Sequence, residues 1–428
     1  TADGQKTHNA GGIYGTIAAT SGKNTISGNL SCEEIKINKK NIASSEKHGK
    51  LVEKEKLQTK QTYEDMGWRF ELEWKMTEKN YPIPRVFSYP DSEITRVTAS
   101  IKEDGMGFSW YSKKEEDAYV DISTDSDMKN AKKTVASVQS TKNGFRCTAE
   151  VKGLKADTTY YYQVQSGETV SETGTFCTAP ENGAFTFLNL AGTDSGSLNE
   201  TSVAADTMRV ALNTCKNAAF LLHSGSMIDA ERVEEAWKEL FFQAQDTFLE
   251  VPVIPTVGSE GAGVMLDQFN VGEKGYYSFD YSNAHIAVLD TNEDTEQCVS
   301  DAQLEWLKDD VVKARKNGAE WIILSVNKGP YTTGNSADNK EVAGLRSVLL
   351  PVIDELEIDL VLQGQDHILG RTYSIKDGNA DKTEYMEMVN GKRFYYSLSE
   401  NGTIYFMPGQ AGTRMETVSY THLRAHET

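Results

Sequence analysis

Residues 219–229 read Ala-Phe-Leu-Leu-His-Ser-Gly-Ser-Met-Ile-Asp, an apolar run that ends in a loop of small and polar residues. A short apolar run favours a buried strand, and the amphipathic pattern that follows it at Glu234–Phe248 favours a helix. The same alternation recurs nearby, with strands expected at Phe185–Leu190, Ala219–His223, Val251–Val257, Ala284–Leu289, Trp321–Val326 and Asp359–Leu362. This alternation predicts a layered α/β domain over residues 181–417.

The helices of this domain are expected near Val203–Cys215, Glu234–Phe248, Asp301–Asn317 and Lys340–Leu356. The third of them has the clearest limits. Ser300 and Gln303 have the spacing of a capping box, and Gly318 is a helix-ending residue. We therefore expect Ser300 and Gln303 to cap the first turn of that helix reciprocally.

A different pattern precedes the α/β domain. Between Ile94 and Pro180, short runs alternate apolar with polar residues and are separated by turn residues such as Asn143-Gly144. Alternation with period two is typical of half-buried strands, so residues 91–180 are predicted to form an antiparallel β-sandwich. Residues 1–62, rich in Gly, Ser, Asn and Lys, are interpreted as a polar leader or linker. Within residues 63–90, Trp68–Met76 alternates as a strand and Tyr81–Pro84 is expected to be a linker.

Length and charge narrow the possible functions. A chain of 428 residues is expected to hold about two or three domains. Its net charge of -19 argues against nucleic acid or an anionic membrane as a partner, because both are polyanions. No apolar run approaches the length of a membrane span, and the five cysteines form no CxxC pair. The apolar runs therefore predict no membrane span, and the cysteine spacing predicts no zinc site.

Two parts of the chain resemble known families. The stretch Gly153–Val164, which contains Tyr160, is similar to the corner of fibronectin type III domains. Together with Phe176-Cys-Thr-Ala-Pro180 it resembles the N-terminal domain of purple acid phosphatases. In the α/β half, the loops that resemble the signature blocks of calcineurin-like metallophosphoesterases are Leu190–Asp194, His223–Ala230, Pro255–Glu260, Val326–Gly334 and Leu362–His367. The resemblance implies a multidomain chain in which a fibronectin III-like β-sandwich precedes a four-layer αββα metallophosphoesterase-like domain.

The resemblance also implies a centre of two divalent cations, held by carboxylates, imidazoles and an Asn carbonyl, that acts on phosphate esters. Most of those ligand types are missing from this sequence. The motif positions hold Gly192, Asp194, Ser226, Ser259, Glu260, Asn327, Gln365 and His367. Because Ser226 replaces the carboxylate that bridges the two metals, no catalytic residue and no metal cofactor are expected. Asp194 and His367 remain as residual metal ligands.

Three hypotheses follow. In the first, the chain is an inactive metallophosphoesterase homologue, a pseudophosphatase, with a binding or scaffolding role in an exported multidomain protein. By resemblance it lies outside the cell or at the cell surface, although no signal peptide is visible, and binds an unidentified protein or glycan. In the second, it is an active phosphoesterase that uses one metal on Asp194, His367 and Glu260. In the third, the sandwich is an adhesion or glycan-binding module.

The last residues, 418–428, read Val-Ser-Tyr-Thr-His-Leu-Arg-Ala-His-Glu-Thr and resemble a translated sequencing adapter. His422 and His426 have the spacing of a helical metal site. We interpret the tail as non-native and reject that pair, which leaves the metallophosphoesterase-like domain C-terminally incomplete after Thr417. His223 and His285 are predicted to be satisfied structural histidines that bond to the backbone.

Overall fold

The computed structural model describes residues 92–103, 105–228, 233–332, 339–382, 384–389, 391–397 and 402–413. It also describes short segments before residue 92, at 30–32, 36–37, 40–41, 44, 50–65, 74–76 and 82–84. Outside the described residues lie the tail at 418–428 with His422 and His426, the predicted strand residues 68–73, and the ends of two predicted loops at 229–230 and 333–334. The chain divides into two compact units, Thr1–Pro90 and Asp91–Thr428.

The first unit contains short elements, both within the segment predicted to be a leader and within residues 63–90. They are β1 Leu30–Cys32, β2 Lys36–Ile37, β3 Lys40–Asn41, β4 Lys50–Val52, α1 Lys54–Leu57, α2 Lys60–Glu64, β5 Trp74–Met76 and β6 Pro82–Pro84. Strand β5 pairs antiparallel with β6. The prediction of a linker at Tyr81–Pro84 is therefore wrong for Pro82–Pro84. Proline lacks a backbone N–H, but an edge strand tolerates it.

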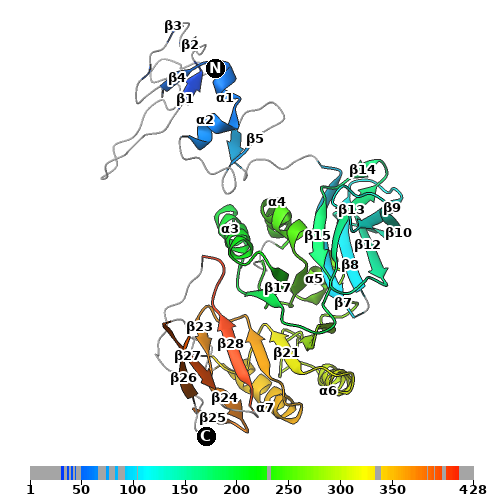
Figure 1. The fold of residues 1–428 in the computed structure, drawn as a ribbon, viewed down its shortest axis with the longest axis vertical. Helices are drawn as coiled ribbons and strands as arrows, with labels where there is room; N and C mark the ends of the chain where they lie inside the picture. Colours follow the sequence, from blue (N-terminus) through cyan, green and yellow to red (C-terminus); the bar gives the residue numbers. More distant parts are fainter. Residues whose placement is uncertain are drawn as a thin grey trace. The chain divides into compact units, whose positions relative to one another are not determined.

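The second unit begins with two antiparallel sheets, drawn in cyan and green in Figure 1. Their strands are β7 Ile94–Lys102, β8 Gly105–Ser112, β9 Ala118–Ser123, β10 Lys132–Val135, β11 Ser137–Thr141, β12 Gly144–Lys152, β13 Thr159–Ser166, β14 Thr169–Val170 and β15 Gly174–Cys177. One sheet has the order β11-β12-β8-β7; the other is β10-β9-β13-β14, with β15 also on β13. Alternate side chains such as Phe108, Trp110, Val120 and Tyr162 are fully buried, as the period-two pattern predicts. The backbone N–H of Lys155 donates to the hydroxyl of Tyr160 at 3.0 Å.

The α/β half follows, with a three-stranded and a six-stranded sheet. The parallel three-stranded sheet consists of β16 Thr186–Leu190, β17 Ala218–His223 and β18 Val253–Pro255. The six-stranded sheet has the order β19 Tyr277–Tyr281, β20 Ala284–Val288, β21 Trp321–Val326, β22 Leu360–Gln363, β28 Ile404–Pro408 and β23 Leu369–Arg371. Two hairpins, β24 Ser374–Lys376 with β25 Asn379–Asp381 and β26 Glu384–Val389 with β27 Lys392–Ser397, lie between β23 and β28 in the sequence.

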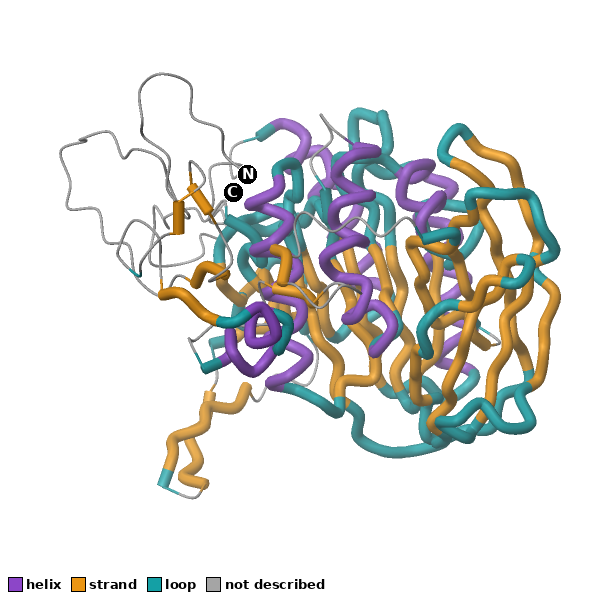
Figure 2. Tube along the Cα trace, turned by 90° about the horizontal axis from the view of Figure 1, so that it is seen from above, coloured by secondary structure: helices purple, strands orange, loops and turns teal. Residues whose placement is uncertain are grey.

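Helices cover these sheets from two sides. They are α3 Leu198–Thr214, α4 Val233–Glu250, α5 Ala262–Gln268, α6 Asp301–Lys316 and α7 Lys340–Glu355. Along β20, Ile286 and Val288 join the core that contains α3 and α4, whereas Ala287 joins the core of α6 and α7. The six-stranded sheet is thus covered on both faces, and Figure 2 shows the helices gathered over the α/β strands beside an all-strand part at the right. Among the described residues, no helix combines the length and apolar character needed to span a bilayer.

Two details of the α/β prediction need correction. The predicted capping box is wrong: Ser300 is the N-cap of α6 but its side chain accepts no capping hydrogen bond. Gln303 is buried and instead exchanges two hydrogen bonds with the backbone of Asp290, at 2.7 and 3.0 Å. The helix expected near Val203–Cys215 begins earlier, at Leu198, because Ser197 caps it by accepting from the backbone N–H of Glu200.

The sandwich packs directly on the α/β half. Arg96 is buried and has a positive φ of 57°; its guanidinium forms an ion pair with Glu234 of α4 and donates to Gln268 of α5 at 3.2 Å. Arg146 of β12 donates to the backbone carbonyls of Leu266 and Asp267 near the C-terminus of α5, at 2.6 and 2.9 Å. The buried apolar residues of the sandwich form one continuous core with those of α3, α4 and the three-stranded sheet.

Candidate functional site

The motif positions all follow the carboxyl ends of parallel strands. Gly192 and Asp194 come after β16, Ser226 after β17, and Glu260 after β18. The remaining positions, Asn327, Gln365 and His367, follow β21 and β22 of the other sheet. In an open α/β sheet the carboxyl ends of the strands form the usual ligand-binding edge. The contacts below show which of these residues actually meet.

The loops after β16 and β17 run side by side. The backbone N–H of Gly192 donates to the Gly225 carbonyl at 3.2 Å, and that of Asp194 donates to the Ser226 carbonyl at 2.9 Å. Gly192, Asp194 and Ser226 all have positive φ values, of 56°, 41° and 56°. This conformation is rare for residues with a side chain, and strained backbone of this kind clusters at functional sites. The first two motif loops therefore keep a site-like backbone.

Asp194 and His367 come together across the two sheets. His367 Nε2 lies 3.0 Å from Asp194 Oδ2, and Gln410, which follows β28, donates to the same oxygen at 3.2 Å. A Cβ placed on Gly192 would lie 3.3 Å from both the His367 ring and the Gln410 side chain. The position of the missing first carboxylate thus still faces His367. Gln410 was not predicted, because no motif in the sequence pairs it with Asp194.

The position of the bridging carboxylate is part of a neutral network. The Asn327 side-chain amide donates to Ser226 Oγ at 3.3 Å and to the Ser224 carbonyl at 3.3 Å. In turn, Asn292 donates from its amide to Asn327 Oδ1 at 3.1 Å and to the Val257 carbonyl at 3.0 Å. Asn292 was not predicted as a site residue, because no motif in the sequence pairs it with Asn327. None of these hydroxyl and amide groups has the charge that would offset a second dication.

Glu260 and Ser259 differ in their surroundings. Ser259 is exposed, whereas Glu260 is buried and accepts from the backbone N–H of Gly258 at 3.3 Å. Its other oxygen, Oε2, is buried without a hydrogen-bond partner among the described residues. Burial, with smaller contributions from the Asp194 and Asp290 carboxylates, raises the pKa of Glu260 to about 7. Near neutral pH this side chain is therefore partly protonated and holds less negative charge than an ordinary glutamate.

Gln365 lies beside Asn327, and its backbone N–H donates to the Asn327 carbonyl at 2.9 Å. A cavity of about 10 Å³ adjoins Gln365 and Asn327. Its lining residues are Asn327, Gly329, Thr332, Val342, Gln363, Gln365 and Asp366. That volume holds about one water molecule and excludes a substrate. The loop after β22 is therefore closely packed around its amide side chains.

His223 lies beneath the loops and acts as a structural histidine. Its Nε2 is 3.2 Å from Thr193 Oγ1, which itself donates to the Met227 carbonyl at 2.7 Å. The Thr193 hydroxyl must then accept from the ring, which fixes the Nε2–H tautomer. Burial lowers the pKa of His223 to about 4, so the ring is neutral at physiological pH.

The donor set does not fit a two-metal centre. A pair of dications about 3.5–4 Å apart requires a carboxylate that bridges both, and Ser226 supplies a hydroxyl instead. In the part of the chain that the structure describes, no three His, Cys, Asp or Glu side chains are arranged to hold a metal ion. Asp194 and His367 are the two ligand-type side chains that meet in a site otherwise lined largely by hydroxyl and amide groups.

Comparison with known proteins identifies the first domain of the second unit. Residues 93–178 match the family described as purple acid phosphatase, N-terminal domain. Purple acid phosphatase 21 of Arabidopsis thaliana is 28% identical over 116 residues, which are 27% of this chain and 26% of that protein. An uncharacterized protein of Mycobacterium tuberculosis is 23% identical over 116 residues, 27% of this chain and 22% of that protein. The chain thus spans about a quarter of the length of these curated relatives.

Solved structures extend the likeness to the α/β half. Purple acid phosphatase PPD1 from yellow lupin (Lupinus luteus) seeds has a TM-score of 0.60 at 15% identity, covering 77% of this chain and 67% of its own. The structure of PhoD has a TM-score of 0.53 at 12% identity, covering 76% and 79%. At such identities the likeness establishes the fold. The matched domain and the likeness in fold together confirm the resemblance seen in the sequence: residues 93–178 belong with the N-terminal domain of purple acid phosphatases, and the α/β half that follows has a fold similar to that of a solved purple acid phosphatase.

Proposed function

We propose that this chain is a pseudophosphatase, a metallophosphoesterase homologue that has lost hydrolysis and serves as a binding or scaffolding protein. The observation that carries the proposal is the contact between Ser226 and Asn327. At the place of the bridging carboxylate, a hydroxyl accepts from an amide at 3.3 Å. A neutral pair cannot offset the mutual repulsion of two adjacent dications. Gly192, at the first-carboxylate position, has no side chain to replace it.

We further propose the finer architecture that the resemblance implies. The bond from the Lys155 N–H to the Tyr160 hydroxyl, at 3.0 Å, supports a fibronectin III-like corner in the sandwich. Cores on both faces of the six-stranded sheet support a four-layer αββα order in the α/β half. A location outside the cell or at its surface, and a protein or glycan partner, are proposed from the resemblance to exported sandwich–phosphatase proteins.

Metal content and hydrolysis together test the loss of catalysis. The purified chain is dialysed against trace manganese, zinc and iron, and its metals are measured by elemental analysis alongside turnover of a chromogenic phosphate ester. We expect well under one metal per chain and no enzyme-like turnover. Two tightly held metals per chain, or turnover abolished by Asp194→Ala with His367→Ala, would contradict the proposal.

A one-metal phosphoesterase is the second candidate, and two observations favour it. Asp194 and His367 already lie 3.0 Å apart, and Glu260 has a buried oxygen without a partner among the described residues. Three protein ligands with one open position can form a catalytic site, but Asp194, Glu260 and His367 are not arranged around a common metal position, so Glu260 would have to move toward the other two. This candidate requires one metal per chain that is lost in both Asp194→Ala and His367→Ala, together with turnover that depends on it. Retention of metal by both variants would exclude this candidate.

A further inference from the structure

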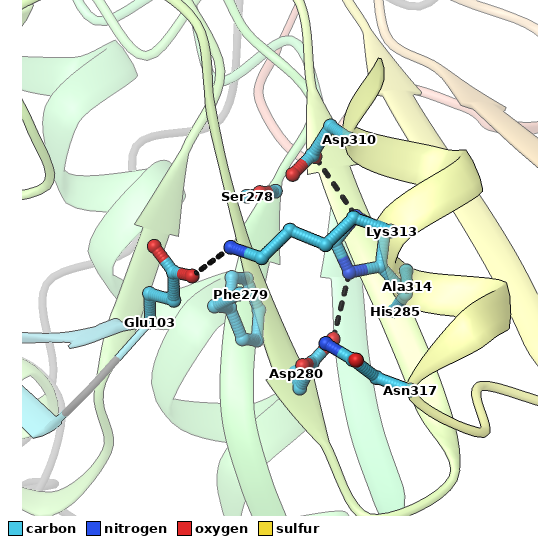
Figure 3. A pocket seen from close by; sticks show the side chains of 9 residues that line it. All are labelled: Glu103, Ser278, Phe279, Asp280, His285, Asp310, Lys313, Ala314 and Asn317. Atoms are coloured by element: carbon cyan, nitrogen blue, oxygen red, sulfur yellow. Dashed lines mark hydrogen bonds and ion pairs between the residues drawn. The ribbon is translucent and has the colours of Figure 1, made fainter. Parts of the chain in front are cut away.

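His285 lies outside the candidate site, at the edge of the six-stranded sheet, with a carboxylate at each ring nitrogen (Figure 3). Its Nδ1 is 2.7 Å from Asp280 Oδ1, and its Nε2 is 2.9 Å from Asp310 Oδ2. Asp280 is the direct cross-strand partner of His285 on β19, and Asp310 belongs to α6. One imidazole therefore connects two strands and the helix that covers them.

This geometry requires a charged ring. A neutral imidazole has one N–H and one lone pair, whereas the imidazolium donates from both nitrogens. With two carboxylates as acceptors, a neutral ring would turn its lone pair toward one of them. The side chains of His285 and Asp310 are only 5% and 15% exposed, so water cannot readily replace a donor lost at Asp310, whereas Asp280 is 55% exposed and can be hydrated. The two short contacts are satisfied together only by the imidazolium.

The surrounding charges agree with this assignment. Besides Asp280 and Asp310, the charged groups near the ring are Lys313 of α6 and Glu103, which lies between β7 and β8. From β21, the residue opposite His285 is the apolar Ile322. Burial by itself would lower the pKa of His285, but the hydrogen bonds to Asp280 and Asp310 outweigh it and raise that pKa to about 9.

Two other roles for this region, ligand binding in the adjoining cavity and attachment of α6 through Lys313, are poorly supported. The adjoining cavity is about 20 Å³, which holds about one water molecule and excludes a substrate-sized ligand. The ion pair between Lys313 Nζ and Glu103 Oε1, at 2.6 Å, joins side chains that are 61% and 65% exposed. Such exposed pairs contribute little to stability. Attachment of α6 at this edge therefore depends on the buried imidazole more than on the lysine.

We propose that Asp280, His285 and Asp310 form a latch that fastens α6 to the edge of the sheet and is released at alkaline pH. When the ring loses a proton, one carboxylate keeps its donor and the other faces a lone pair. Because Asp280 is 55% exposed and Asp310 only 15%, the remaining N–H stays with Asp310, and the connection from α6 through the ring to β19 is released. This device concerns the fold and is independent of whether the chain hydrolyses phosphate esters.

The direction of the pH dependence follows from linkage. The ordinary pKa of 6.5 is raised to about 9 in the folded chain, so the stabilisation is complete below about pH 6.5 and is lost as the pH rises through about 9. The interval between these values corresponds to a roughly 300-fold change in the unfolding equilibrium constant. Urea unfolding of the full chain and of His285→Gln, from pH 6 to pH 10.5, measures it.

We expect His285→Gln to raise the unfolding equilibrium constant relative to the parent. The ratio of the two constants, variant to parent, should be roughly 300-fold larger at pH 6 than at pH 10.5. Lys313→Met, from the same cavity, is the matched control and should leave the pH dependence unchanged. If parent and His285→Gln respond alike to pH, or Lys313→Met behaves as His285→Gln does, the latch is wrong.

A second measurement covers the case in which His285→Gln does not fold. In proton NMR of the full chain, one histidine ring signal should titrate above pH 8, and in Asp310→Asn its midpoint should fall because one acceptor has lost its charge. The absence of any histidine signal with a midpoint above pH 8 overturns the proposal by itself.

Discussion

Replacing the residues at the motif positions by the family's ligand types should restore metal binding. The full variant carries Gly192→Asp, Ser226→Asp, Ser259→Asn, Glu260→His, Asn327→His and Gln365→His. Its loops keep the backbone that the ligands need, since Asp194, Gly192 and Ser226 share the left-handed conformation and Asp194 already meets His367 at 3.0 Å. The Ser226 position is expected to be necessary, because its carboxylate serves both metals.

The structure sets the size of the effect. At Gly192 the new side chain must adopt a φ of 56° and lie 3.3 Å from His367 and Gln410, a strain that costs about 1–3 kcal/mol. Ser226 already has a φ of 56° as a non-glycine residue, so its substitution adds no backbone strain of this kind. Metal at a hundredfold excess over its Kd stabilises the folded chain by about 2.7 kcal/mol. We therefore expect a Tm near that of the parent once metal is bound, and about 1–4 °C lower without it.

Thermal unfolding with and without manganese or zinc, together with elemental analysis, measures this difference. The matched control keeps Ser226 and carries the other five substitutions; it should bind at most one metal and show a smaller rise in Tm. If the control matches the full variant, or the parent itself gains several degrees with metal, the argument from the bridging position is refuted.

Three further outcomes are expected. Glu260→Gln should stabilise the chain by about 3 kcal/mol at pH 8 and have little effect at pH 4.5. The pKa of Glu260 is about 7 in the folded chain and 4.5 ordinarily, so ionisation of this side chain destabilises the fold as the pH rises. Urea unfolding at the two pH values measures the sign of the effect. Tyr160→Phe should cost about 1 kcal/mol by leaving the Lys155 N–H without its acceptor, measured by urea unfolding with the partly exposed Tyr161→Phe as control. A chelator should leave the Tm of the parent unchanged, and a fall of several degrees in a thermal scan would reveal a resident metal.

Local sequence patterns predicted the order of the strands and helices well where a pattern is long. The apolar runs at β17, β20 and β21 and the amphipathic stripe of α6 are all present. Several short elements of the α/β half were missed, among them β23 and the hairpin strands β24–β27. Helix α5 has only seven residues, too few to show a helical period, and β19 alternates over five residues that begin after a loop. Short elements take their structure from tertiary packing more than from their own sequence.

The candidate site was predicted in composition and only partly in its contacts. The meeting of Asp194 with His367 agrees with loops at the carboxyl ends of strands in the two sheets. The partners of these groups do not: Gln410 reaches Asp194 from 216 residues away, and Asn292 reaches Asn327 from 35. Gln303 is a second example: its position three residues after the N-cap was predicted, but its side chain bonds to the Asp290 backbone instead of capping the helix. Polar side chains select partners by geometry that only the folded chain defines.

The buried contacts of Arg96 and Arg146 bear on where this protein can be divided. The family match ends at residue 178. Contacts nevertheless cross this boundary: Arg96 is paired with Glu234, and Arg146 donates to the carbonyls at the end of α5. The apolar core is shared across it as well. A cut near Pro180 would leave two cations and an apolar surface facing water on one fragment, and unpaired acceptors on the other. The segment matched by the family and the segment that folds cooperatively are therefore different in this chain. The sandwich supports the α/β half structurally, and we do not expect it to be exchangeable for another domain.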